Sequence, residues 1–229
     1  MKNLLRVSVL VLGLFLLNSN VNAQDAKSES IDRAKIKYRM ALQFNDYAQA
    51  KSAIYDLMVL EPTNHSYLDS LAFMYFEFRQ YASAALTSKE ALKYNSQNQV
   101  LLQVAAQSFD QLGAIDQSLK MYQRLYNLSD DAFVLFEIAN QQYELKNYDE
   151  AMINTELLLG KSVVNNNMVV VKNAENKEIQ VPFKAVVYNL QGLIARAQGN
   201  EESAKKYFNS ALELAPDYAL VKENLNTSK

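Results

Sequence analysis

Residues 185–218 read AVVYNLQGLIARAQGNEESAKKYFNSALELAPDY, and this stretch decides the fold. Its small and apolar residues recur every three or four positions on both sides of Gly199, which is the spacing of one face of an α-helix. Gly199 suits the left-handed residue that ends a helix, and Pro216 stops a second helix. The stretch therefore predicts two amphipathic helices joined by a tight turn. The residues on the two predicted faces are Tyr188, Gly192 and Ala195, then Ala204, Phe208, Ala211 and Leu212.

A similar turn occurs five times along the chain. Residues 45–50 read NDYAQA, and residues 146–151 read KNYDEA. A small residue closes each copy, at successive spacings of 34, 34, 33 and 53 residues. Because one helix pair cannot bury its apolar face alone, pairs that recur at a fixed period are expected to stack. The five closing residues are Ala50, Ala84, Ser118, Ala151 and Ala204.

This pattern resembles the tetratricopeptide repeat (TPR), a family defined by large, small and aromatic residues at set positions of a motif of about 34 residues. The frame that begins at Ala185 matches best. The frame that begins at Ile31 departs most, since Tyr38 stands where a small residue is expected. The resemblance implies an all-α fold, a TPR-like helical-repeat solenoid of about five helix-turn-helix units. The expected repeats are residues 31–64, 65–98, 99–131, 132–161 and 185–218, with a capping helix at about 218–226.

The spacing of 53 residues leaves about 19 residues beyond one repeat. Met168 to Val171 is rich in β-branched residues, and residues 178–183 alternate between polar and apolar. Residues 173–177, NAENK, have turn composition. We therefore expect a β-hairpin insertion at about 162–184. An isolated two-stranded hairpin is only marginally stable in water. It is therefore expected to pack against its own helices, or to serve as a lid or strand-addition edge for a partner.

The N-terminus has the pattern of a secretory signal peptide over residues 1–23. Lys2 and Arg6 precede the apolar run Val7–Leu17, and Val21-Asn22-Ala23 suits a cleavage site before Gln24. An uncleaved anchor is the alternative, although the run is shorter than the about 20 residues of a membrane-spanning helix. Residues 24–30 are expected to be a flexible lead-in. The prediction is an exported protein, periplasmic first and secreted second, with no membrane insertion after cleavage.

Composition excludes several kinds of chemistry. The chain has no Cys and a single His, His65, so thiolate nucleophiles, disulfides and Cys- or poly-His metal centres are ruled out. Residues 24–229 hold 21 basic and 25 acidic residues, whereas nucleic-acid binding needs a basic surface. No phosphate-binding loop or other catalytic motif occurs. We expect no cofactor, no metal, no nucleic-acid partner and no enzymatic activity, with an enzyme kept as a remote alternative.

The resemblance also implies a concave groove lined by positions 2, 5, 9 and 12 of each first helix. Carried onto this chain, these positions are basic at the start, polar in the middle, and aromatic in the second and fourth frames. The alternative for the phenylalanines is packing between repeats or under the hairpin. The carboxylate-binding set of some TPR proteins is absent. The predicted groove residues are Lys35, Arg39, Asp69, Phe73, Phe76, Gln103, Gln107, Phe133, Phe136, Asn140, Tyr143, Asn189 and Arg196.

The leading functional prediction is an exported, non-enzymatic scaffold or assembly subunit that binds a protein or peptide in this groove. Aromatic side chains with a polar surround are what such a surface needs. The alternative is a holdase-like chaperone for unfolded envelope proteins, which would bind many partners through the same phenylalanines. Homodimerisation also stays open, since solenoid ends expose apolar surface unless they are capped.

Overall fold

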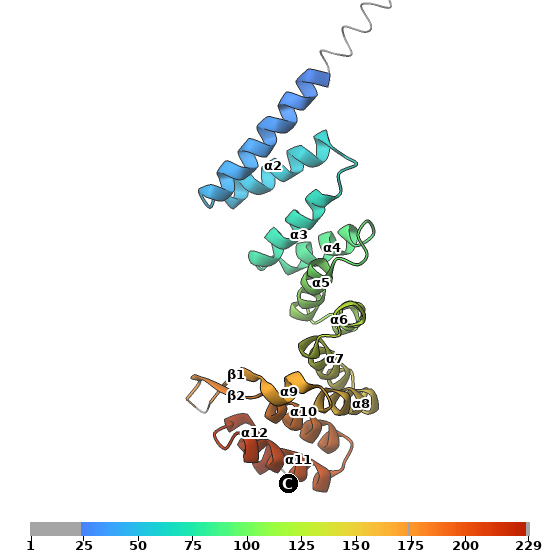
Figure 1. The fold of residues 1–229 in the computed structure, drawn as a ribbon, viewed down its shortest axis with the longest axis vertical. Coiled ribbons are helices and arrows are strands. Elements are labelled where there is room, and N and C mark those ends of the chain that lie inside the picture. The colour runs from blue at the N-terminus through green and yellow to red at the C-terminus, as the bar shows by residue number, and fades with distance from the viewer. Residues whose placement is uncertain (1–23, 174, 228–229) are drawn as a thin grey trace, which may run out of the picture. The chain divides into compact units, whose positions relative to one another are not determined.

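The computed structural model describes residues 24–173 and 175–227, so the predicted signal peptide lies outside the described residues. The described chain is helical except for one hairpin (Figure 1), and this confirms the predicted class. No helix within those residues is both long enough and apolar enough to cross a bilayer. After a helix over residues 24–43, the helices are α2 (Tyr47–Leu60), α3 (Ser66–Glu77), α4 (Tyr81–Ala91), α5 (Gln99–Gln111), α6 (Ile115–Ser129), α7 (Ala132–Glu144), α8 (Tyr148–Leu159), α9 (Ser162–Asn166), α10 (Phe183–Ala197), α11 (Glu201–Leu214) and α12 (Ala219–Asn226).

The chain divides into two compact units, which meet in sequence between Ser96 and Gln97. In the first unit the helix over residues 24–43 is followed by α2, α3 and α4, and α3 packs on both α2 and α4. Residues 24–30 belong to the first helix, which differs from the flexible lead-in expected there. The carboxylate of Glu29 pairs with Arg33 one turn later, which supports this exposed turn. One buried cluster of this unit is formed by Ala41, Ala50, Ile54, Leu71 and Met74.

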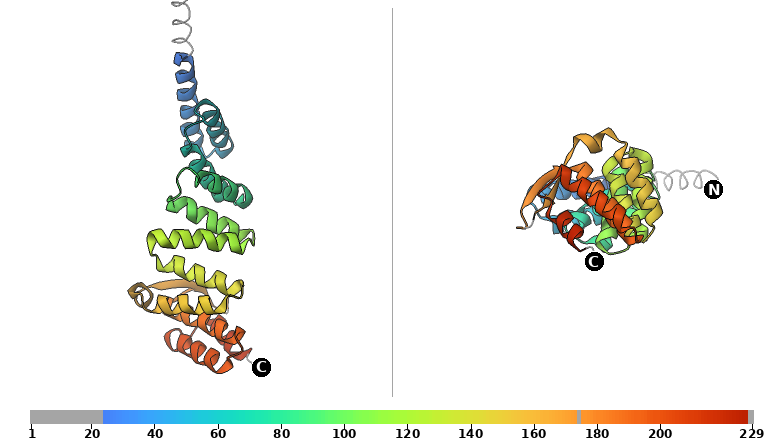
Figure 2. Two further views of the ribbon diagram at one scale, coloured as in Figure 1. Left: turned by 90° about the vertical axis from the view of Figure 1, so that its right-hand side faces the viewer. Right: turned by 90° about the horizontal axis from the view of Figure 1, so that it is seen from below.

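The second unit contains three helix pairs, α5 with α6, α7 with α8, and α10 with α11 (Figure 2). The residues that close the turns in the sequence are fully buried, as Ala151 and Ala204 show. Gly192 in α10 lets Phe208 of α11 approach so closely that a Cβ there would lie 2.4 Å from the ring. Small residues therefore set the distance between paired helices.

A left-handed residue ends the first helix of each pair. The N–H that follows it donates to a carbonyl of the last helical turn, as Asn200 does to Ala195 at 2.9 Å. Gly199 confirms the expected left-handed glycine, Gly113 is a second one, and the three other turns have non-glycine residues at this position. The residues and their φ values are Asn45 (55°), Arg79 (55°), Gly113 (69°), Lys146 (62°) and Gly199 (81°).

The predicted hairpin is present and consists of β1 (Met168–Lys172) and β2 (Glu178–Pro182), paired antiparallel with Val170 opposite Gln180. One face carries valine and isoleucine side chains that pack against the cluster formed by α10, α11 and α12. The five-residue helix α9 precedes it and was not expected from the sequence. The inward-facing residues are Val169, Val171, Ile179 and Val181.

The last helix, α12, lies within one residue of the expected capping segment. Val221 of α12 and Tyr218 just before it are buried in the same cluster as Phe208. The fifth helix pair is therefore covered by the hairpin and by α12 together, which completes a core that one pair could not build alone.

Candidate functional site

A pocket of about 540 Å³ opens in the first unit, and most of its lining comes from the helix over residues 24–43 and from α3. Phe73, a predicted groove residue, is 48% exposed at this pocket. Tyr38 forms part of the wall, where the repeat pattern expects a small residue. Glu77 adds a carboxylate to an otherwise largely apolar lining. The lining residues are Tyr38, Leu42, Tyr47, Ser70, Phe73, Met74, Glu77 and Phe78.

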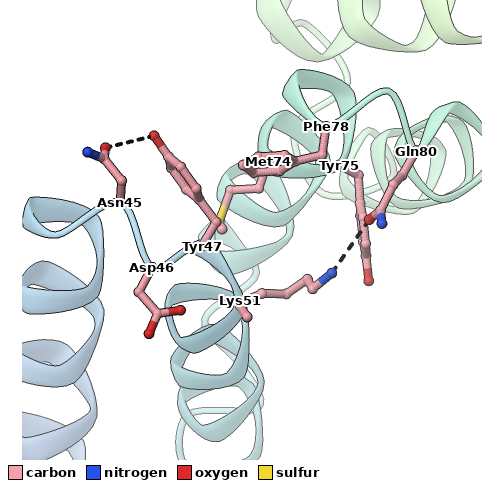
Figure 3. A pocket seen from close by; sticks show the side chains of 9 residues that line it. Asn45, Asp46, Tyr47, Lys51, Met74, Tyr75, Phe78 and Gln80 are labelled. Atoms are coloured by element: carbon pink, nitrogen blue, oxygen red, sulfur yellow. Dashed lines mark hydrogen bonds between the residues drawn. The ribbon is translucent and has the colours of Figure 1, made fainter.

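A second pocket of about 410 Å³ shares Tyr47, Met74 and Phe78 with the first, and Figure 3 shows it from close by. The rings of Tyr47 and Phe78 are in contact, with centroids 4.6 Å apart. Lys51 lies 3.5 Å from the Gln80 side-chain oxygen and 5.1 Å from the centre of the Tyr75 ring. Aromatic surface therefore lies between a pocket that carries the carboxylate of Glu77 and a pocket that carries both Asp46 and Lys51.

The other predicted groove residues of the first unit lie on the same two helices. Lys35 pairs with Glu61 at 3.5 Å, and Arg39 is exposed. A hydrogen bond from Tyr67 and the charge of Lys35 lower the pKa of Glu61. Asp69 is half-buried, as is Phe76, whose ring meets Tyr81 edge-on at 6.0 Å. The Phe76 ring is thus partly packed against Tyr81 and partly exposed to solvent.

In the second unit, carboxylates gather on a surface that we call the α5/α7 surface, defined by Gln103, Gln107, Asp110, Glu137, Asn140 and Glu144. Asp110 accepts a hydrogen bond of 3.2 Å from Gln141, whose amide also donates to Ser118 at 2.6 Å. The Glu137 side chain is partly exposed to solvent, and protein surrounds the rest of it. That surrounding protein raises the pKa of Glu137, and the negative charges of Asp110 and Glu144 raise it further.

This surface also holds the predicted polar groove residues of the third and fourth repeats. Gln103 is exposed, while Gln107 and Asn140 are half-buried. Tyr122 of α6 is buried, and its burial and the charges of Glu137 and Asp110 raise its pKa. Glu137 was not predicted from the sequence. Its position beside a groove position on α7 and the charge at Asp110 are the signals that could have identified it.

Phe133 and Phe136 meet the base of the hairpin. The ring of Phe133 stacks on Phe183 with centroids 4.7 Å apart, and Phe136 meets Phe183 edge-on at 5.4 Å. Phe183 is buried, yet Phe133 remains 42% exposed. The packing alternative therefore holds for part of each ring, and Phe133 keeps an open face.

The C-terminal helix engages two predicted groove residues of the fifth repeat. Asn189 is buried and accepts a hydrogen bond of 2.9 Å from the Asn224 side chain. Arg196 donates to the Asn224 carbonyl at 2.6 Å and pairs with Glu201 at 3.4 Å. These side chains bind the chain's own helix, which corrects their placement as open groove residues. Tyr143 stays half-buried, and burial raises its pKa.

The described residues hold no cluster of three or more His, Asp or Glu side chains arranged for a metal ion. His65 precedes α3, and its ring stacks on Tyr94 at a centroid distance of 3.4 Å. The imidazole therefore has a packing role at the start of a helix. Aromatic, carboxylate and amide groups on first helices suit recognition of a polypeptide better than bond making or breaking.

Comparison with known proteins agrees with this geometry. The tetratricopeptide-repeat profile matches residues 185–218. The comparison with curated protein sequences gives no match. Among solved structures, MamA is 15% identical with a TM-score of 0.63, covering 82% of this chain and 93% of that one.

Two further solved structures have the same arrangement of helices. A tetratricopeptide repeat protein from Parabacteroides merdae ATCC 43184 is 18% identical with a TM-score of 0.63, over 86% of this chain and 71% of that one. YrrB, described as a TPR protein with an unusual peptide-binding site, is 16% identical with a TM-score of 0.66, over 86% and 96%. At these identities the likeness concerns the fold.

Proposed function

Because this chain is a tetratricopeptide-repeat protein, we propose that it is an exported, non-enzymatic scaffold that binds a partner polypeptide through the first helices of its repeats. The fold itself is that of a protein–protein interaction scaffold. The proposal adds the surface used and the compartment. YrrB, with its peptide-binding site and the same fold, supports the general mode of action.

The observation that carries the proposal is the exposed aromatic surface on first helices. Phe73 lines a pocket of about 540 Å³ beside Glu77, and Phe133 presents an open face next to the α5/α7 surface. Such side chains would anchor a peptide, because buried aromatic anchors contribute most of the free energy in typical interfaces. Polar and charged neighbours would then set orientation and specificity.

Affinity capture from an envelope extract tests this proposal, with residues 24–229 as bait. A scaffold is expected to retain one dominant partner, and that partner should be lost when Phe73 and Phe133 are changed to Ser. A bait in which residues 162–181 are replaced by a Gly/Ser loop reports whether the hairpin contributes. Retention of the same partner by the double Ser variant would contradict the use of this surface.

A holdase-like chaperone is the second candidate. The clustering of exposed Phe73, Phe78 and Tyr47 around two open pockets favours it, since a broad apolar surface accepts many unfolded chains. It predicts that the bait captures many unrelated proteins and suppresses the aggregation of a denatured model substrate. A single stoichiometric partner without aggregation suppression would exclude it.

Export rests on the signal-peptide pattern of residues 1–23. Fusion of these residues to an enzyme that is active only outside the cytoplasm is expected to give activity. N-terminal sequencing of the mature chain is expected to begin at Gln24. A mature chain that begins at Met1 and stays with the membrane would favour the uncleaved anchor.

A further inference from the structure

The hydrogen-bond alternation of the hairpin decides which backbone groups point outward. The N–H of Asn173 donates to Lys177 at 2.9 Å at one end, and the N–H of Phe183 donates to Asn167 at 2.9 Å at the other. Bonded and non-bonded pairs alternate in an antiparallel ladder, and Val170 lies opposite Gln180. The N–H and C=O groups of Met168, Val170 and Lys172 therefore point away from β2. No backbone partner within the described residues takes them up.

The two edges of the hairpin are not equivalent. The outward residues of β2 are Glu178, Gln180 and Pro182, and Pro182 has no N–H to donate. The chain also turns directly into α10 at Phe183, which ends this edge. The β1 edge instead has three successive donor–acceptor pairs with no proline. In Figure 1, β1 is drawn on the side of the hairpin nearer α7, and β2 on the side nearer α12.

The β1 edge is also held firmly in place. Val169 and Val171 pack against the helices of the fifth repeat, so the strand cannot turn its edge away without exposing them. Met168 and Val170 remain 52% and 59% exposed on the opposite face. Lys172 puts one charge at the turn end of this edge, opposite Glu178 of β2, while Met168 and Val170 leave the rest of it apolar. A fixed edge strand without proline is a template for another strand.

We propose that the β1 edge is a strand-addition site, at which an extended, basic segment of the partner polypeptide adds as a third strand. This rests on the proposed polypeptide-binding function and specifies its form: main-chain bonds to Met168, Val170 and Lys172 give affinity and register. A five-residue edge alone is too small to hold a stable second copy of this chain, whereas a partner strand can continue onto neighbouring surface.

The charge of the occupant follows from the surrounding unit. Residues 97–229 contain 12 Lys and Arg against 16 Asp and Glu, while residues 24–96 contain nine of each. On the α5/α7 surface, the negative charges of Asp110 and Glu144 act unfavourably on the charged form of Glu137. A basic segment would be attracted to this unit by its net negative charge.

The test uses residues 24–229 and a defined probe, the peptide acetyl-Lys-Val-Lys-Val-Lys-Val-Lys-Val-amide, which alternates basic and apolar residues. Val170→Pro removes one outward N–H while keeping every bond within the hairpin. Gln180→Pro makes the same change directly across the ladder, on the opposite edge, and is the matched control. Val170→Thr keeps the N–H and the β-branched shape, and so separates backbone from side chain. Thermal melting establishes that all variants are folded.

Strand addition predicts that Val170→Pro weakens probe binding about tenfold, while Gln180→Pro and Val170→Thr change it less than about threefold. Two N-methylated probes, one methylated on the lysines and the other on the valines, should differ by a similar factor, because only one alternate set of N–H groups faces β1. The amides of Met168, Val170 and Lys172 should gain protection from hydrogen exchange in the complex.

Equal binding by the two proline variants, equal binding of the two N-methylated probes, or no binding at millimolar concentration would overturn strand addition. The proposed scaffold function is judged separately by the envelope partner. If that partner is lost when Phe73 and Phe133 are both changed to Ser but is unaffected by Val170→Pro, the scaffold stands and strand addition fails. If the partner survives both changes, both proposals fail.

Discussion

Gly192 has no side chain, and the ring of Phe208 occupies the space where a Cβ would lie. A helical glycine normally costs stability, since alanine favours the helix by about 1 kcal/mol. Here the close approach of α10 and α11 outweighs that preference. The same residue could be predicted from the sequence, because it falls on a small position of the most specific repeat.

Gly192→Ala is expected to destabilise the protein by about 1–3 kcal/mol, since the added methyl group overpacks a buried ring. Urea denaturation measures the loss. The double variant Gly192→Ala with Phe208→Leu tests the cause, because a smaller side chain makes room for the methyl group. The double variant should therefore lose less stability than the sum of the losses of the two single variants. Strict additivity of the two substitutions would contradict the steric explanation.

Glu137 has a raised pKa, which makes its charged form unfavourable in the fold. The folded state therefore binds the proton more tightly than the unfolded state, and stability falls as pH rises from the usual glutamate pKa through the raised one. Glu137→Gln is expected to stabilise the protein at pH 7 by at most about 1 kcal/mol, because the side chain is partly exposed. The gain should vanish near about pH 4. Thermal melting at both pH values checks the sign, and destabilisation at pH 7 would contradict it.

At the scale of elements, the hairpin and the capping helix have different degrees of predictability. A β-branched run predicted the first strand, and alternation with a period of two predicted the second, because both patterns are local information. The short helix α9 leaves no such signal in five residues. The coverage of Asn189 and Arg196 by α12 depends on where that helix docks, which no local pattern encodes.

Truncation after Asp217 removes α12 and with it the buried side chains of Tyr218 and Val221. The loss of these contacts is expected to destabilise the fifth repeat by roughly 3–5 kcal/mol. Hydrogen exchange should report lost protection in α10 and α11. Lys222→Ala, an exposed position on the same helix, is the control and should leave protection unchanged. Unchanged protection after truncation would show that α12 is not a cap.

At the scale of the whole molecule, the repeat period was enough to predict the helical class and most of the helix pairs. The period could not predict the pockets of the first unit, which depend on how Tyr47, Met74 and Phe78 meet. Nor could it predict the carboxylates of the α5/α7 surface, which come from two helices distant in sequence. Contacts between side chains of different repeats are tertiary information, and repeat motifs leave those positions variable.

Repeat proteins distribute stability locally, since each repeat contacts mainly its neighbours. Gly192→Ala is therefore expected to lower protection of amides in α10 and α11 while leaving α2 and α3 unchanged, as measured by native-state hydrogen exchange. A uniform loss of protection across residues 24–227 would indicate a single cooperative unit instead.

The central claim is that first helices, and not second helices, bind the partner polypeptide. The most direct measurement compares partner capture by two double variants, each of which removes two exposed apolar side chains. Phe73→Ser with Phe133→Ser removes aromatic side chains from α3 and α7, while Leu86→Ser with Ile153→Ser removes exposed aliphatic side chains from α4 and α8. We predict that the first pair loses at least about tenfold in affinity and the second less than about twofold. Equal loss, or greater loss with Leu86→Ser and Ile153→Ser, would contradict the account.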